Sequence, residues 1–151
     1  MNVAAARSLS RWFAAVLAAA TLTAVAAASG IDATKSGITA TFRQMNVPVE
    51  GRFKVFRGTL DFDPKNLASA RARIEIDTAS FDLDAPEYEE ELRGKEWFDT
   101  QTYPQARFVS SSVSALGPNR FEAKGRFTLK GKTREIVVPF TQRIDGGMRV
   151  F

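Results

Sequence analysis

The 151-residue sequence contains no cysteine and no histidine. Without these residue types it cannot form a disulfide, a thiolate or imidazole metal site, a cysteine nucleophile or a Ser-His-Asp triad. Carboxylate pairs remain, but Glu75 and Asp77 alternate with Arg71 and Arg73, a pattern typical of solvated cross-strand ion pairs. A glycine-rich phosphate loop is also missing. We therefore expect no enzymatic activity, no metal and no cofactor.

The start of the chain has the features of an export signal. Arg7 and Arg11 precede an apolar, alanine-rich run that ends near Ala28 with two overlapping Ala-x-Ala sites. The alternative, a transmembrane anchor, is disfavoured because the run is short, about 17 residues, and only weakly apolar. We predict a signal peptide over residues 1–28 and a single mature domain over residues 29–151, periplasmic and without a lipid anchor.

The charge of the chain argues against nucleic acid as a partner. The formal net charge is +4, and the two arginines of the predicted signal contribute half of it. A domain with so small an excess of basic residues, interleaved with acids, lacks the electrostatic footprint of a nucleic-acid-binding protein. The sequence leaves the oligomeric state open.

Alternation between apolar and polar residues runs through most of the mature chain, and the segment from Phe121 to Lys130 shows it most clearly. A period of two predicts strands with one dry and one wet face. The second predicted strand changes parity near Phe56, which favours a β-bulge at residues 56–58; a simple break between two short strands is the alternative. Strands are predicted over residues 38–43, 50–63, 68–77 and 121–130. Two more are predicted, one with Phe108, Ser110 and Ser112 on the same face and one that carries Ile136, Val138 and Phe140.

One short helix interrupts this pattern. Residues 87–93 follow Pro86, which fits a first helical turn, and precede Gly94, a typical helix end; Asp84 or a neighbour is expected to cap it. A helix this short cannot form a second domain. We interpret it as a lid or plug on an otherwise all-β domain.

The predicted inner face is rich in phenyl rings. Ten of the twelve phenylalanines lie between Phe42 and Phe140, and small residues are expected opposite them. Two interpretations remain open: a packed core in which small and large residues alternate, or an elongated apolar cavity, which eight strands can enclose. The residues predicted to line such a cavity are Phe42, Phe53, Ala70, Ala72, Ile74, Ile76, Phe108, Ser110, Ala123, Gly125, Phe127 and Phe140.

An ordered set of short motifs extends over roughly residues 32–144. It comprises Asp32 to Ile38 with Phe42, Gly51-Arg52-Phe53, Phe56-x-Gly58, Leu60-x-Phe62-Asp63-Pro64, Ile74 to Ser80, Leu92, Trp97-Phe98-Asp99, Tyr103-Pro104-x-Ala106-x-Phe108-x-Ser110 and Gly125-x-Phe127-Thr128-Leu129-x-Gly131-x-Thr133. This set resembles the YceI-like family of exported lipid-binding proteins.

The resemblance implies an antiparallel lipocalin-like β-barrel that holds a polyisoprenoid or similar amphiphile. Two departures affect this expectation. Lys35 stands where the family commonly has histidine, and family members continue for about two strands beyond the position of Phe151. Two alternatives remain open: either the sequence is a fragment of a longer protein, or the barrel is incomplete at its C-terminus and has an exposed sheet edge.

The leading hypothesis is periplasmic binding, transport or sequestration of a polyisoprenoid or other long-chain amphiphile, exchanged by transient contact with a membrane. Each CH₂ group moved out of water contributes about 0.8 kcal/mol, so an apolar interior suffices as the chemical basis. One alternative is a non-catalytic structural or interaction β-domain of the cell envelope with a packed core. A small outer-membrane barrel is disfavoured by the charged helix and the missing aromatic girdle.

Overall fold

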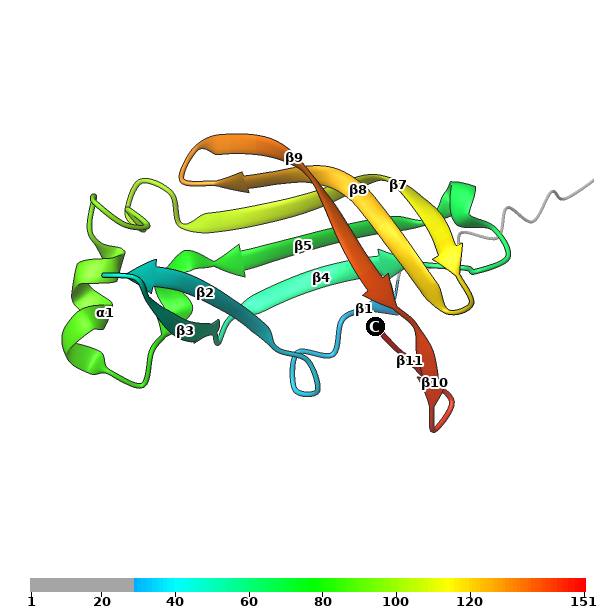
Figure 1. Cartoon of the computed structure of the whole chain (residues 1–151), viewed down its shortest axis with the longest axis horizontal. Helices are drawn as coiled ribbons and strands as arrows, with labels where there is room; N and C mark the ends of the chain where they lie inside the picture. Colours follow the sequence, from blue (N-terminus) through cyan, green and yellow to red (C-terminus); the bar gives the residue numbers. More distant parts are fainter. Residues whose placement is uncertain (1–28) are drawn as a thin grey trace, which may run out of the picture.

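The computed structural model describes residues 29–151, so the predicted signal peptide lies outside the described residues. Three antiparallel sheets make up the fold (Figure 1). The largest has six strands in the order β1-β4-β5-β7-β8-β9, a second has the order β2-β3-β6, and β10 pairs with β11. The strands are β1 (Ser29–Gly30), β2 (Ile38–Gln44), β3 (Val47–Phe53), β4 (Phe56–Asp61), β5 (Arg71–Asp77), β6 (Phe81–Asp82), β7 (Gln105–Gly117), β8 (Arg120–Leu129), β9 (Lys132–Thr141), β10 (Arg143–Asp145) and β11 (Met148–Val150).

Tight two-residue turns join several of these strands. Lys130 and Gly131 both have positive φ, at 48° and 69°, and connect β8 to β9 directly. Gly146 and Gly147 adopt positive φ in the same way between β10 and β11. Two-residue turns with positive φ match the right-handed twist of the strands they join, and glycine adopts that conformation without steric cost.

The change of parity in the second predicted strand has a different cause from the one we expected. Phe53 and Phe56 belong to different strands, β3 and β4, in different sheets, so the chain is broken there rather than bulged. Ser80 binds the two residues between β3 and β4. Its Oγ accepts a hydrogen bond of 3.0 Å from the Val55 N–H, and its carbonyl oxygen accepts one of 3.1 Å from the Lys54 N–H. The bulge prediction is wrong, and the alternative of two short strands is confirmed.

Register shifts occur instead in β7, between Ser110 and Ser112 and again between Ala115 and Gly117. The first shift turns Ser112 outward, where it is exposed, and brings Val113 to the inner face in its place. The prediction that Ser112 shares a face with Phe108 is therefore wrong. An extra residue in one strand also bends the sheet locally.

The helix α1 (Pro86–Arg93) ends at Gly94 as predicted, with Pro86 in its first turn. The N-cap residue is Ala85, the neighbour of Asp84, and its side chain makes no capping hydrogen bond. Leu92 is the buried residue of the helix and joins the hydrophobic core, which places α1 against one end of the sheets (Figure 1). None of the helices in residues 29–151 combines the length and apolarity needed to cross a bilayer.

The structure confirms an antiparallel β fold with a short α-helix. Within residues 29–151, however, the three sheets do not join into a closed barrel. β9 pairs with β8 along one side, and no strand of the described chain pairs with its other side. The inner face of the large sheet therefore ends at an open edge.

Candidate functional site

The candidate site is the inner face of the six-stranded sheet, defined here as the face that carries Phe108, Gly125 and Phe127. The strand register pairs Ile74 with Phe108, and Phe108 with Phe127. Paired residues of an antiparallel ladder point to the same face, so these three side chains form a row across β5, β7 and β8. The neighbouring row runs through Ser110, Gly125 and Ile136. Both rows are dominated by apolar or small residues.

A first aromatic cluster fills the end of the molecule next to α1. Phe53 and Phe81 have ring centroids 4.8 Å apart, Phe81 and Phe98 are 5.3 Å apart, and Phe42 and Trp97 are 5.2 Å apart. Tilted and edge-on pairs at such distances are favourable packing arrangements for aromatic rings. This end of the inner face is therefore a packed core.

A second aromatic cluster occupies the opposite end. The Phe62 ring lies 5.0 Å from Phe121, 5.7 Å from Phe140 and 5.4 Å from Phe151. The Arg149 guanidinium stands 5.9 Å from the centre of the Phe62 ring, within the range of a cation–π contact. The phenyl rings that the sequence places inside thus gather at two separate ends.

Two hollows border these clusters. One of about 260 Å³ lies beside the first cluster and is bounded by Phe42, Leu83, Tyr88 and Trp97 among others. The other, of about 300 Å³, lies at the second cluster next to Phe140. The two hollows share no lining residue and are open to solvent, so neither forms an elongated tunnel between the clusters.

All twelve residues predicted to line a cavity are buried or half-buried. They divide into three groups along the molecule. Phe42, Phe53, Ile74, Ile76 and Phe127 belong to or contact the first cluster, Ala70 and Phe140 belong to or contact the second, and Ala72, Phe108, Ser110, Ala123 and Gly125 are assigned to neither cluster.

The small residues of this third group leave less room than the sequence suggests. A Cβ atom at Gly125 would lie 2.8 Å from the Phe108 ring and 2.5 Å from the Val109 carbonyl oxygen, so the ring occupies the space that glycine leaves. Ser110 has a bonding role, because its Oγ accepts a 2.8 Å hydrogen bond from the Ala72 N–H. The accessible part of the inner face is consequently shallow, and its exposed apolar surface comes from half-buried side chains such as Ile74 and Phe127.

On the outer face of the sheet, the buried carboxylate of Glu75 forms ion pairs with three arginines. Glu75 is 7% exposed and pairs with Arg73 at 2.8 Å, with Arg107 at 3.0 Å and with Arg57. Its pKa is lowered, first by the hydrogen bond from Arg73. The predicted cross-strand ion pairing is confirmed for Glu75, although the carboxylate is buried rather than solvated.

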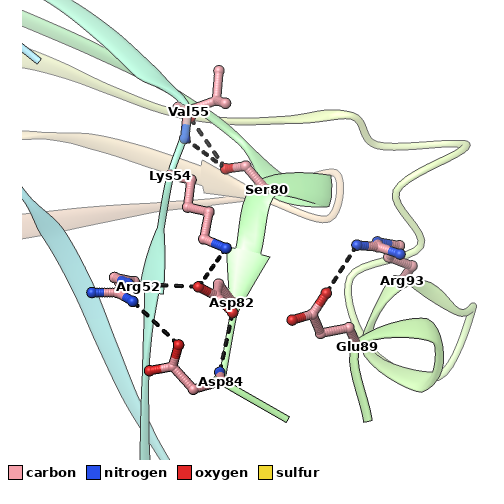
Figure 2. A network of polar contacts seen from close by, with 8 residues as sticks. All are labelled: Arg52, Lys54, Val55, Ser80, Asp82, Asp84, Glu89 and Arg93. Carbon is pink, nitrogen blue, oxygen red and sulfur yellow. Dashed lines mark hydrogen bonds and ion pairs between the residues drawn. The ribbon is translucent and has the colours of Figure 1, made fainter. Parts of the chain in front are cut away.

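A second ionic network links β3 to β6 (Figure 2). Asp82 is 6% exposed; Lys54 Nζ lies 2.7 Å from its Oδ2, and Arg52 Nε lies 3.6 Å from the same oxygen. The Lys54 ammonium, followed by the Asp84 N–H that donates to Oδ1, lowers the pKa of Asp82 to about 2. This network fixes the three-stranded sheet beside α1.

Across residues 29–151, acidic side chains form no group of three suited to a metal ion.

A model of the YceI-like domain matches residues 30–149, nearly the whole described chain. The chain belongs to the YceI-like family. A UPF0312 protein of Vibrio cholerae is 34% identical over 90 residues, which cover 60% of this chain and 48% of the relative. A UPF0312 protein of Pseudomonas savastanoi is 32% identical over 98 residues, covering 65% and 51%. The chain spans about half the length of the curated relatives it matches.

Solved structures of the family share the fold. BcnA of Burkholderia cenocepacia is 44% identical with a TM-score of 0.75, over 79% of this chain and 75% of that one. A mutant YceI protein of Campylobacter jejuni has a TM-score of 0.60 at 20% identity, over 75% of this chain and 67% of that one. At that identity the likeness concerns the fold alone.

Several buried or half-buried phenylalanines of this YceI-like domain do not appear among the residues predicted to line a cavity, among them Phe62, Phe81, Phe98 and Phe121. Phe62 and Phe121 lie near the ends of predicted strands, and their parity with Leu60 and Ala123 already indicates the apolar face for both. Phe81 and Phe98 had no comparable signal. One lies in a two-residue strand and the other in the loop after α1, where no periodicity develops.

Proposed function

We propose that this YceI-like protein is exported to the periplasm, where it binds a polyisoprenoid or similar long-chain amphiphile without catalysing a reaction. The tail would lie along the inner face of the six-stranded sheet, as one wall of a lipocalin-like barrel. Family membership supports a binding role. The polyisoprenoid and the periplasm are inferred from the resemblance and from the sequence of residues 1–28.

The observation that carries the proposal is the partly exposed apolar surface that begins beside the first aromatic cluster, at Ile74 and Phe127, and continues onto β9. Ile74, Phe127 and Ile136 are half-buried, and Val138 is 38% exposed although its register partner on the inner face is the buried Ala123. A soluble protein that leaves contiguous apolar surface accessible commonly uses it for binding. Covering it with an alkyl-like tail would gain about 0.8 kcal/mol per CH₂ group removed from water.

The packed clusters favour a second candidate, the structural or interaction domain. Rings that meet 4.8–5.7 Å apart at both ends of the inner face are what a plain core would show. The two candidates differ in what happens to the rest of that face. A binding protein covers the partly exposed apolar surface of its inner face with a small molecule, whereas an interaction domain binds no small molecule there.

Native mass spectrometry of protein purified from its own host tests the proposal directly. We expect a bound species whose mass is released by organic extraction. Protein that arrives free of ligand, and that fails to bind an apolar dye, would contradict the proposal.

A pair of variants on one strand adds a second test. Phe127→Ala should weaken binding because it removes a half-buried ring at the margin of the first cluster. Phe121→Ala, on the same face of β8 but 5% exposed within the second cluster, should lower stability by about 3–5 kcal/mol with a smaller effect on binding. If both variants change stability alone, the interaction domain is the better description.

A further inference from the structure

The inner positions of β9 change character along the strand. Phe140, Val138 and Ile136 pair with Phe121, Ala123 and Gly125, which are buried on the inner face. Continuing the same register by steps of two, Arg134 pairs with Phe127 and Lys132 with Leu129. Since paired residues share a face, β9 presents three apolar positions and then two basic ones to the inner side.

Both basic residues are exposed, and neither forms an ion pair or a side-chain hydrogen bond with any residue of the described chain. The outer face behaves differently, because Arg57, Arg73 and Arg107 there share the carboxylate of Glu75. Arg134 and Lys132 therefore keep their hydrogen-bond donors available beside an apolar surface.

The spacing suits an extended amphiphile. Phe140 lies six positions after Arg134, and at about 3.4 Å per residue this interval spans about 20 Å of strand. A tail placed over the apolar positions would bring its head to the basic pair. A guanidinium forms charge-assisted, often bidentate hydrogen bonds with oxyanions, and such bonds strengthen next to apolar surface because the local dielectric is lower.

We propose that Arg134, assisted by Lys132, binds the anionic head of the amphiphile while its tail lies along Ile136, Val138 and Phe140. The head is an oxyanion such as a phosphate, attached to an apolar chain. This inference rests on the proposed function and adds the charge of the ligand to it.

The test compares two probes with the same 15-carbon tail, farnesol and farnesyl phosphate, by calorimetry on delipidated protein, with native mass spectrometry for stoichiometry. We expect farnesyl phosphate to bind about tenfold more tightly at low ionic strength, a difference of 1.4 kcal/mol. Added salt should narrow the gap, because Arg134 and Lys132 are exposed. Inorganic phosphate alone should not compete with farnesyl phosphate.

The variant Arg134→Gln/Lys132→Gln should bind farnesyl phosphate only as tightly as the unmodified protein binds farnesol, and its affinity for farnesol should stay the same. Arg126→Gln/Lys124→Gln is the matched control: it removes the same charge from the outer face of the neighbouring strand β8 and should keep the preference. A preference that survives the first variant, or effective competition by inorganic phosphate, overturns the inference. Equal binding of the two probes by the unmodified protein overturns it while sparing the proposed function, and failure of both probes to bind overturns both.

Discussion

Gly125→Ala should destabilise the domain, because the added methyl group has no space at the centre of the inner face. Its Cβ would lie 2.5 Å from the Val109 carbonyl oxygen and 2.8 Å from the Phe108 ring. Overpacking of this kind costs about 1–3 kcal/mol. Replacing glycine by alanine returns about 0.4–1 kcal/mol by restricting the unfolded chain. The net loss should be about 1–2 kcal/mol.

For a domain of this size, each kcal/mol corresponds to roughly 4 °C in Tm, so we expect a fall of about 4–8 °C in thermal denaturation followed by circular dichroism. Gly30→Ala is the matched control, since a Cβ there meets no atom within 4 Å. It should leave Tm nearly unchanged. If Gly125→Ala matches this control, the close packing of Phe108 on Gly125 is refuted.

A double variant separates the two contacts at Gly125. Phe108→Leu shortens the side chain that a Cβ would meet but leaves the Val109 carbonyl in place. In combination with Gly125→Ala it should therefore restore part of the lost stability, and a double-mutant cycle should show the two changes to be coupled. Strict additivity would mean that the ring does not occupy the space over Gly125.

Two further predictions concern buried polar groups. The pKa of Asp82 is lowered from 3.8 to about 2, so between these two pH values the unfolded state binds more protons than the folded state. The contribution of the ionised Asp82 to the free energy of unfolding is therefore complete above about pH 4 and is lost as the pH falls through about 2. Urea denaturation from pH 6 to pH 2 should show a shallower acid dependence in Lys54→Met than in the control Lys65→Met, and equal slopes would contradict this. Thr78 is 1% exposed and its Oγ1 donates to the Tyr103 carbonyl at 2.9 Å, so Thr78→Val should cost about 1–2 kcal/mol. Thr78→Ser keeps the donor and should unfold at a higher denaturant concentration than Thr78→Val; the reverse order would show that the hydroxyl is unimportant.

Most strands of this protein are determined by local sequence. Alternation identifies β8 along its whole length, and the turn at Gly131 follows from the need for positive φ between β8 and β9. The order of short motifs from Asp32 onward identifies the YceI-like family, which the family match confirms. These features depend on neighbours in the chain, and a period of two already states which residues share a face.

Only the tertiary structure decided which sheet each strand joins and what lies against each inner residue. Parity marks a discontinuity near Phe56 but does not distinguish a bulge from the passage of the chain into another sheet, which depends on the contact of Val55 with the distant Ser80. The same holds for Gly125: small size is visible in the sequence, but the ring that fills its space comes from another strand. Likewise, Arg134 stands out as an inner residue only when its pairing with Phe127 across the β8–β9 ladder is known. Each of these outcomes depends on contacts between strands or loops, and periodicity within one strand carries no information about them.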